Sequence, residues 1–504
     1  MSGGEELLVV GKRIKVEDVV AVGRFYEEVE VSEETRNTLN KSRKVVEEII
    51  ERGRAVYGIN TGFGALASVR VSREKLDQLQ RNILLSHAAG FGDPLEEEVV
   101  RGMLFLRAVS LSKGFSGVRP VVVEKLVELL NKRVYPYVPS KGSVGASGDL
   151  APLAHAVLPI IGEGFVIKEG EVKRAREVLR ELSIDPISLE EKEGLALVNG
   201  TQAMASILSF VVRDSLRLLQ LATIASAISF ASLNGIKDAF DPRIHELRPH
   251  NGQRKIARWF WELLRDYPQP ESSKVQDAYT LRTIPQVYGA VLDTIEYVKG
   301  VLEVEINSVT DNPLVLENGD VISGGNFHGE PLALAADFLS IALTDLGNMI
   351  ERRVDRILNP KTNEGLPAFL AGGEEGLNSG YMLFQYTAAA LCNENKVLSH
   401  PASSDTIPTS AYQEDHVSMG MNAALKLKRI FENLISILSI ELLVGSVAFH
   451  MRFGDAKFQV ADLAARFYKL VEKRNGDDLF WEDFQRVRKE VSEIIRREES
   501  LLNS

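Results

Sequence analysis

The sequence predicts an all-α protein, with a bundle of long helices at its centre, a glycine-rich loop near one end of that bundle, and only short peripheral strands. Three observations favour this fold class. Apolar residues recur mainly at spacings of three and four, which is the period of an amphipathic helix. Runs that alternate apolar and polar residues, as half-buried strands do, are few. Stretches rich in Gly, Pro and Asn separate the helical segments.

The first clear helix start lies at Ser32. A serine can cap a helix, and Glu33 and Glu34 place negative charge in the first turn. Gly53 is the predicted end, because glycine readily adopts the left-handed conformation that follows many helices.

The longest helices are expected in the middle and second half of the chain. Asn234-Gly235 supplies a stop for the first of them, and apolar helical stretches also cover 331–352 and 428–450. The residues that mark one helix face are Met204, Ile207, Leu208, Val211, Ser215, Leu218 and Leu219, and near the C-terminus Phe484, Val487, Val491, Ile494 and Ile495.

Irregular stretches at 135–152, 266–274 and 359–380 interrupt these helices, and loops on a rigid scaffold often carry catalytic groups. We expect three regions within one continuous catalytic unit. They are residues 1–200 with the glycine-rich loop, 201–455 with the long-helix bundle, and 456–504 with the C-terminal helices.

Composition narrows the class of protein. The charged fraction of 26%, the hydrophobic fraction of 45% and the net charge of -11 suit a globular chain without the basic stripe that binds nucleic acid. The single cysteine, Cys392, excludes an intramolecular disulfide and a cysteine-based metal cluster. The most apolar stretch, 216–236, is interrupted by polar residues, so we expect a buried helix rather than a membrane span. The N-terminus does not read as a secretory signal, and a cytoplasmic protein is expected.

The most unusual segment is Gly142-Ser-Val-Gly-Ala-Ser-Gly-Asp149. It fails the G-x-S-x-G pattern of a nucleophilic serine at the last position. No Lys-Ser/Thr follows the glycines, as a phosphate-binding loop requires. A plain glycine-rich turn entering a helix at Leu150 would also account for it.

A third interpretation uses the chemistry of Ala146-Ser147-Gly148. If the Gly148 nitrogen attacks the Ala146 carbonyl carbon, a five-membered ring closes, and two dehydrations leave an exocyclic methylene at Ser147. The small residues Ala and Gly allow the tight backbone that this needs. The product is a methylidene-imidazolone, an electrophile formed autocatalytically with no exogenous cofactor and no metal.

The residues around this triplet resemble the aromatic amino acid ammonia-lyase family. The match runs from Gly142 to His155, G-S-V-G-A-S-G-D-L-A-P-L-A-H. Further blocks recur in the expected order over most of the chain: Tyr57–Gly64, Leu195–Gln202, Gln276–Arg282, Ser323–His328 and Gln413–Met419. The resemblance implies the electrophile described above and the elimination of ammonia from an amino acid.

The resemblance also implies roles for individual residues. Tyr57 would remove the β-proton, which requires the site to stabilise a phenolate whose ordinary pKa is about 10. Tyr279 would lie beside the electrophile, and Gln276 would contact the substrate. Arg282 would clamp the substrate carboxylate with its planar fork. A helix would place these last three residues roughly on one face.

Two further residues are expected at the electrophile. Asn199 would lie near the imidazolone oxygen, where a hydrogen bond draws electron density from the methylene. Phe327 would pack against the ring. Whether the electrophile captures the amine or the ring of the substrate stays open.

Two positions indicate histidine as the substrate. Ser86-His87 resembles the pair found in histidine-specific members, and Glu414 resembles the carboxylate that those members place against the imidazole. Imidazole carries a donor and an acceptor, whereas a phenyl ring would leave a desolvated glutamate without a partner. Such a mismatch can reject an analogue by roughly 10⁴-fold. The expected reaction converts L-histidine into trans-urocanate and ammonia.

The sequence departs from the family pattern at two places. Ala278 replaces a proline, which should alter only a turn, and Tyr412 replaces an asparagine at a position that could adjoin the substrate ring. Phenylalanine or tyrosine ammonia-lyase activity and a 2,3-aminomutase reaction with the same electrophile therefore remain alternatives.

Other classes fit less well. In His245-Glu-Leu-Arg-Pro-His250 the second histidine falls one residue late for a metalloprotease motif, and Pro249 disrupts the helix. A non-catalytic helical scaffold would not need Ser147, Tyr57 and Arg282, which are all present. The resemblance implies a homotetramer whose sites draw residues from three subunits, so that Tyr57 and Glu414 need not reach the Ser147 of their own chain.

Overall fold

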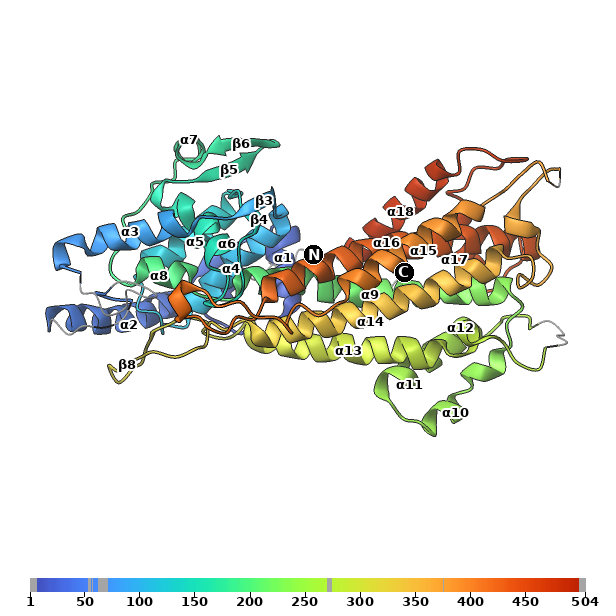
Figure 1. The fold of residues 1–504 in the computed structure, drawn as a ribbon, viewed down its shortest axis with the longest axis horizontal. Helices are drawn as coiled ribbons and strands as arrows, with labels where there is room; N and C mark the ends of the chain where they lie inside the picture. The colour runs from blue at the N-terminus through green and yellow to red at the C-terminus, as the bar shows by residue number, and fades with distance from the viewer. Residues whose placement is uncertain are drawn as a thin grey trace, which may run out of the picture. The chain divides into compact units, whose positions relative to one another are not determined.

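The computed structural model describes residues 7–52, 56, 58–61, 71–269, 274–374 and 376–497, and long helices dominate them (Figure 1). Within these ranges the strands are two to four residues long and pair two by two, β1 with β2 in parallel and the other pairs antiparallel. The prediction of an all-α protein with only short strands is confirmed.

The chain forms two compact units. Unit 1 contains residues 1–210, 299–337 and 401–425, and unit 2 contains residues 211–298, 338–400 and 426–504. The division by sequence into 1–200, 201–455 and 456–504 stays a prediction about regions of one catalytic unit.

Within the described residues, unit 1 holds eight complete α-helices of short or medium length and all the strands. The helices are α1 (Val16–Arg24), α2 (Glu33–Glu51), α3 (Leu76–His87), α4 (Glu97–Ser112), α5 (Pro120–Asn131), α6 (Leu150–Val157), α7 (Ala175–Glu181) and α8 (Glu193–Val198). The strands are β1 (Leu8–Val10), β2 (Val29–Val31), β3 (Phe91–Pro94), β4 (Pro139–Lys141), β5 (Phe165–Lys168), β6 (Glu171–Arg174), β7 (Leu314–Val315) and β8 (Val321–Ile322).

Helix α4 forms the centre of unit 1. Every residue from Val99 to Ser112 is buried, and α1 and α5 pack against it. Its two arginines are buried as well, and Arg101 donates to the backbone carbonyls of Val22, Gly23 and Leu130. The buried Arg101 guanidinium thus finds its hydrogen-bond acceptors in the backbone.

The predicted start of the first long helix is confirmed. Ser32 Oγ accepts a hydrogen bond from the Thr35 nitrogen at 3.1 Å, which caps α2. The helix ends at Glu51, and the predicted stop at Gly53 lies outside the described residues. Helix α6 begins at Leu150, where the glycine-rich turn was expected to enter a helix.

Four helices of 22 to 34 residues are divided between the units. They are α9 (Gln202–Ser232), α13 (Ile284–Glu305), α14 (Glu330–Leu358) and α16 (Gly420–Phe453). The apolar periodicity at 204–219 and the stretches at 331–352 and 428–450 predicted three of them.

The remaining helices of unit 2 are shorter. They are α10 (Pro242–Glu246), α11 (Asn251–Leu263), α12 (Tyr279–Arg282), α15 (Met382–Leu398), α17 (Gln459–Tyr468) and α18 (Trp481–Arg496). The buried face of α18 carries the predicted residues Phe484, Val487, Val491, Ile494 and Ile495.

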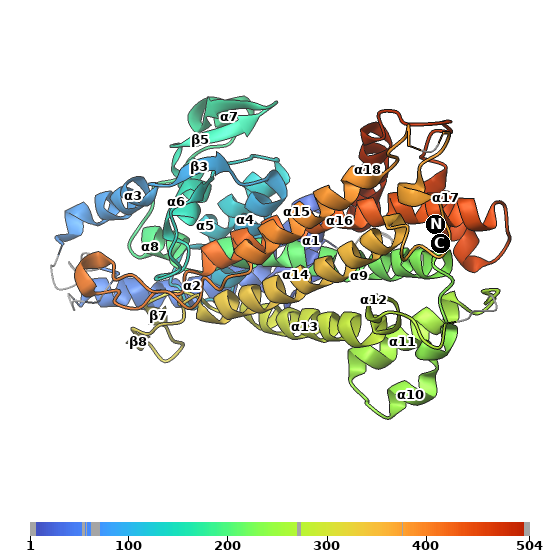
Figure 2. The same cartoon turned by 45° about the vertical axis from the view of Figure 1, so that its right-hand side comes forward.

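A buried polar network joins the four long helices in unit 2, where they run side by side (Figures 1 and 2). Arg353 on α14 donates to Glu441 on α16 at 2.5 Å and also to Tyr288 on α13. On α9, Ser226 bonds to the Tyr288 hydroxyl, and Ser229 donates to Glu441. All five side chains are buried, so each charge depends on its partners.

Two of the long helices, α14 and α16, have the length and apolar composition of a membrane span. Within the apolar 18-residue stretch of each helix, 67% of the residues of α14 and 83% of those of α16 are buried in the protein, as in core helices.

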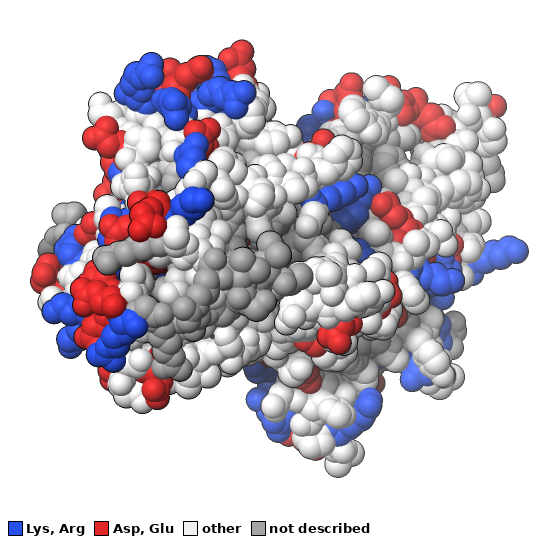
Figure 3. Space-filling view, turned by 60° about the vertical axis from the view of Figure 1, so that its left-hand side comes forward, with Lys and Arg blue, Asp and Glu red and all other residues white. Residues whose placement is uncertain are grey.

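On the face of the molecule drawn in Figure 3, Lys and Arg side chains are interspersed with Asp and Glu side chains.

Removal of one partner from the buried Arg353–Glu441 pair is expected to destabilise the fold strongly. Glu441→Ala would leave the guanidinium buried and unpaired, and should lower the free energy of unfolding by about 3–5 kcal/mol in urea titrations. The matched control is Glu490→Ala, which removes the more exposed pair with Arg466 and should cost less than about 1 kcal/mol. Equal losses would contradict this assignment.

Candidate active site

The glycine-rich loop between β4 and α6 lies in unit 1 against the segment that follows α8. Gly148 has a φ of +73°, and a Cβ added to it would lie 2.1 Å from the Gly200 carbonyl oxygen. At Gly145, with a φ of +67°, a Cβ would lie 2.2 Å from Ser418 Oγ. Only glycine allows the backbone this conformation and this close approach.

Asp149 fastens the end of the loop. Its nitrogen donates to the Gly200 carbonyl at 2.7 Å, and its carboxylate accepts from the Met204 nitrogen and from Ser143 Oγ, both at 2.9 Å. Burial raises the pKa of Asp149 to about 6, although these hydrogen bonds oppose the shift.

Ser147 lies between two polar side chains from distant parts of the chain. Its hydroxyl donates to Glu414 Oε1 at 2.8 Å, and its carbonyl accepts from Asn199 Nδ2 at 2.9 Å. The other Glu414 oxygen accepts from Thr409 Oγ1 at 2.7 Å, which fixes the carboxylate. Glu414 thus reaches the Ser147 of its own chain. Asn199 therefore donates to the Ser147 carbonyl oxygen, which would become the oxygen of the imidazolone ring if the triplet cyclises.

Ser147 opens into a cavity of about 680 Å³, and every described residue that lines it belongs to unit 1. Most of the residues that line it are polar, and four apolar side chains complete the wall. The residues that line it are Ile83, His87, Ser147, Leu150, Leu195, Asn199, Asn312, Ser323, Gly324, Phe327, Ser410, Gln413 and Glu414.

The cavity brings together four side chains that the sequence singled out: His87, Asn199, Phe327 and Glu414. His87 is the last residue of α3, and its Nδ1 lies 3.1 Å from Ser86 Oγ. Burial lowers the pKa of the His87 imidazole below its usual value, and the Glu414 carboxylate partly opposes this. His87 is therefore a neutral donor or acceptor at pH 7.

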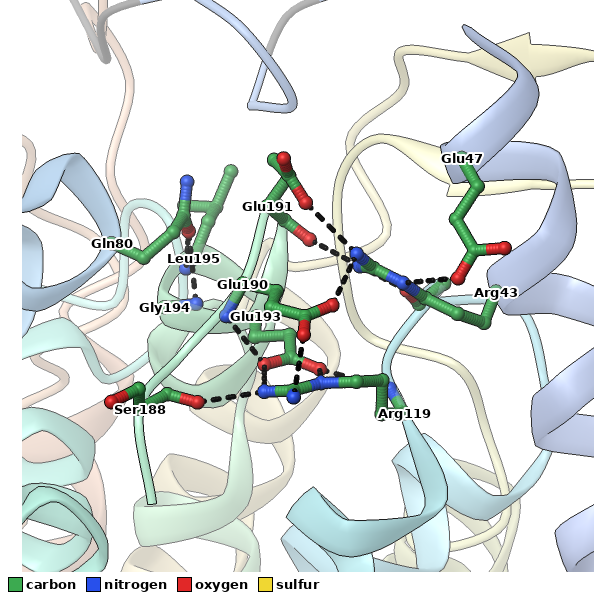
Figure 4. A network of polar contacts seen from close by, with 11 residues as sticks. Arg43, Glu47, Gln80, Arg119, Ser188, Glu190, Glu191, Glu193, Gly194 and Leu195 are labelled. Atoms are coloured by element: carbon green, nitrogen blue, oxygen red, sulfur yellow. Dashed lines mark hydrogen bonds and ion pairs between the residues drawn. The ribbon is translucent and has the colours of Figure 1, made fainter. Parts of the chain in front are cut away.

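Helix α8, which ends at Val198 just before Asn199, is held by the polar network of Figure 4. Gln80 on α3 accepts from the Gly194 nitrogen at 2.9 Å and from the Leu195 nitrogen. Arg119 pairs with Glu193, the first residue of α8, at 2.7 Å. Because α3 carries His87, these contacts fix two walls of the cavity relative to each other.

The network extends through the residues just before α8. Glu190 accepts from both Arg119 and Arg43, at 2.7 and 2.8 Å, and Glu191 accepts from Arg43 at 2.9 Å (Figure 4). The connection into α8 is therefore tied to α2 and to the start of α5.

The other predicted residues lie elsewhere. Gln276, Tyr279 and Arg282 belong to unit 2 and do not line this cavity. The helix begins at Tyr279, so the expectation of one shared helix face was wrong for Gln276. The Arg282 guanidinium lies 4.7 Å from the centre of the Tyr279 ring, and its Nε donates to the Asp277 carbonyl at 2.9 Å. Tyr57 lies outside the described residues.

Sequence reasoning missed several lining residues. Gln413, Ser323 and Gly324 stand inside blocks quoted for the family resemblance, which was the available signal. Asn312 stands in none of them; its Oδ1 accepts from the Gly324 nitrogen at 2.8 Å and so shapes the wall. Tyr412 is 80% exposed and does not line the cavity.

The metalloprotease-like motif begins in α10 and continues into the connection before α11. His245 lies in α10 and bonds to Ala239 and Gln253, whereas His250 precedes α11. In the part of the chain that the structure describes, no group of three or more His, Cys, Asp or Glu side chains could hold a metal ion.

Comparison with known proteins gives a consistent result. The sequence model of the aromatic amino acid lyase family matches residues 14–473. The chain is 50% identical over 446 residues to a histidine ammonia-lyase of Alkaliphilus oremlandii, covering 88% of each chain. It is 49% identical over 474 residues to one of Caldanaerobacter subterraneus, covering 93% of this chain and 92% of that one.

Solved structures agree with the fold. A histidine ammonia-lyase from Trypanosoma cruzi superposes with a TM-score of 0.90 at 38% identity, covering 97% of this chain and 94% of that one. A tyrosine aminomutase from Streptomyces globisporus superposes with a TM-score of 0.92 at 35% identity, covering 97% and 98%. The fold alone therefore does not separate lyases from aminomutases.

Burial of Asp149 predicts a pH-dependent cost to stability. Its pKa is about 6 in the folded protein, against 3.8 for an ordinary aspartate, so between pH 4 and 6 the folded state binds more protons than the unfolded state. The free energy of unfolding should therefore fall as pH rises through this window, relative to Asp149→Asn, by up to about 3 kcal/mol. Urea titrations at several pH values measure the difference. The exposed Asp93, changed to Asn, is the control, and a pH-independent difference for Asp149→Asn would contradict the prediction.

Proposed function

Because the chain belongs to the aromatic amino acid lyase family, we propose that it removes ammonia from L-histidine and releases trans-urocanate. The observation that carries the choice of substrate is the joint presence of Glu414 and His87 in the cavity beside Ser147. A carboxylate and a neutral imidazole offer partners for both nitrogens of the substrate ring, which a phenyl ring could not use. The curated relatives named above support the same substrate.

The proposed electrophile is a methylidene-imidazolone formed from Ala146, Ser147 and Gly148. Ring closure joins the Gly148 nitrogen to the Ala146 carbonyl carbon, whose oxygen leaves as water. A second water takes the Ser147 hydroxyl and its Cα proton, and leaves a carbon–carbon double bond. The residues fit this product, since Gly148 has no room for a side chain and the Ser147 carbonyl already has a donor in Asn199. When formed, the ring supplies an electron-poor double bond that activates the substrate for elimination.

The side chains of the cavity have separate tasks in this proposal. Asn199 donates to the Ser147 carbonyl and withdraws electron density from the methylene. Glu414, held by Thr409, accepts from the substrate imidazole. Phe327 covers the site and helps to exclude water. Tyr57 is proposed as the base that removes the β-proton.

The remaining residues are proposed to come from other subunits. Arg282 as carboxylate clamp, with Tyr279 and Gln276, belongs to unit 2, whereas the described residues that line the cavity all belong to unit 1. A homotetramer with shared sites would supply them, and isolated monomers would then be inactive. We propose the cytoplasm as the compartment, which the single cysteine, Cys392, supports.

The first test is direct. Purified protein is offered histidine, phenylalanine and tyrosine separately, and the products are separated and identified. Urocanate with free ammonia from histidine is expected. β-Histidine would indicate an aminomutase, and a preference for phenylalanine or tyrosine would overturn the proposed substrate.

Ser147→Ala should abolish turnover, because no hydroxyl remains to be eliminated. Intact-mass analysis of the wild-type chain should show a deficit of two waters, whereas the variant should lack the methylene and the absorbance of the conjugated ring. Helix content by circular dichroism is the control for folding. Activity retained in the variant would remove the electrophile from the mechanism.

Glu414→Gln should lower kcat/KM for histidine by about 10²-fold or more, and much less for phenylalanine. Because Glu414 also bonds to the Ser147 hydroxyl, the mass deficit of the variant is measured first. The matched control is Glu317→Gln, an exposed residue of unit 1 that does not line the cavity. Equal losses for both substrates would mean that Glu414 does not read the imidazole.

A further inference from the structure

Arg107 on α4 is a fully buried cation that the mechanism above does not use. One of its nitrogens, Nη1, donates to the Asn199 carbonyl at 3.0 Å and to Gln202 Oε1 at 2.9 Å. Among the described residues, its Nε and Nη2 have no hydrogen-bond partner. The guanidinium therefore bonds to one short segment, residues 199–202.

That segment faces the glycine-rich loop. Asn199 is the residue at which the chain leaves α8, and its side-chain amide donates to the Ser147 carbonyl at 2.9 Å. Gly200 follows, and its carbonyl accepts from the Asp149 nitrogen at 2.7 Å. Asn199 is thus the single residue between Arg107 and the proposed ring oxygen.

The contact with Arg107 leaves this segment little freedom. A Cβ added to Gly200 would lie 2.3 Å from Arg107 Nη1 and 2.8 Å from the Thr310 carbonyl oxygen. Gln202, the other acceptor of Arg107, donates in turn to Thr310 Oγ1 at 2.8 Å. The Asn199 carbonyl and the residues that follow it, Gly200 and Gln202, therefore all contact one buried group.

Stability is a poor explanation for a cation at this place. Burial lowers the pKa of Arg107 to about 10, so the group still carries its charge at neutral pH and bears the cost of desolvation. Well-packed apolar residues often replace buried charges with no loss of stability. The carboxyl end of α8 favours a positive charge, but that contribution is small.

We propose that Arg107 is a positioning residue for the electrophile. It holds the Asn199 backbone so that the Asn199 side-chain amide keeps its hydrogen bond to the Ser147 carbonyl oxygen. Through this oxygen, electron density is drawn from the methylene. This inference rests on the proposed function, because the Ser147 carbonyl matters to catalysis only if the ring forms.

Arg101 provides a matched control on the same helix. It is also buried and also donates to backbone carbonyls, those of Val22, Gly23 and Leu130, none of which lines the cavity. Arg101→Lys and Arg107→Lys keep the charge and shorten the reach of the donor in the same way.

The experiment is a double-mutant cycle on the full-length protein with Arg107→Lys, Asn199→Ala and both changes together. The readouts are kcat and KM for histidine, the mass deficit of two waters, the absorbance of the conjugated ring and the thermal midpoint. Arg107→Lys should lower kcat by at least about 10-fold and change KM by less than about threefold. The upper limit is the roughly 10²- to 10³-fold loss expected when a preorganised donor such as the Asn199 amide is removed. Arg107→Lys should also shift the absorbance of the ring. The kcat of the double variant should lie within about threefold of the kcat of Asn199→Ala, because Arg107 acts through Asn199.

Arg101→Lys should change the thermal midpoint without changing kcat or the absorbance. If Arg107→Lys behaves in the same way, or if its effect multiplies with that of Asn199→Ala, the proposal is wrong. Should Arg107→Lys fail to fold, Gln202→Glu replaces it, since a carboxylate there draws the guanidinium from the Asn199 carbonyl and should also lower kcat and shift the absorbance. An unchanged kcat and absorbance in that variant would equally overturn the proposal. Wild-type protein without the mass deficit would instead refute the proposed function, and this inference with it.

Discussion

The close approach of two backbone segments, at Gly148 and Gly200, is the constraint on which the rest of the site depends. No side chain fits between them, and the pairing of Asp149 with the Gly200 carbonyl fixes their separation. Beside this contact the Asn199 amide donates to the Ser147 carbonyl, and Arg107 binds the Asn199 backbone carbonyl from the other side. The geometry around the serine therefore follows from a contact that only glycine permits.

Buried charges hold the short helix that ends at this contact. A helix of six residues has little stability of its own, so α8 is placed by its surroundings. At its start, the fully buried Lys192 forms an ion pair with Asp311, with Nζ 2.6 Å from Oδ2, and Arg119 pairs with Glu193. At its end, Arg107 binds the Asn199 carbonyl. A mobile α8 would move both Leu195 and Asn199 in the cavity wall.

The cavity divides its work between polar and apolar groups. Ile83, Leu195 and Phe327 supply apolar surface, while Glu414 and His87 are the two titratable side chains among the polar residues that line it. Because Thr409 already binds one oxygen of Glu414, the carboxylate is held in position before any substrate arrives. Such preorganisation reduces the cost of ordering the site on binding.

From the sequence alone followed the all-α class, three of the four long helices, the capped start of α2 and the family, because periodicity, caps and motif strings are properties of neighbouring residues. The sequence identified His87, Asn199 and Glu414 through family blocks, but it did not place Gln276 correctly relative to α12, since helix ends are weakly encoded. Only the tertiary structure decided that Asn199 and Glu414, 52 and 267 residues away in sequence, meet at Ser147. It alone revealed Arg107 behind Asn199, 92 residues away. Such contacts depend on how distant helices pack against one another, and no local pattern specifies that packing.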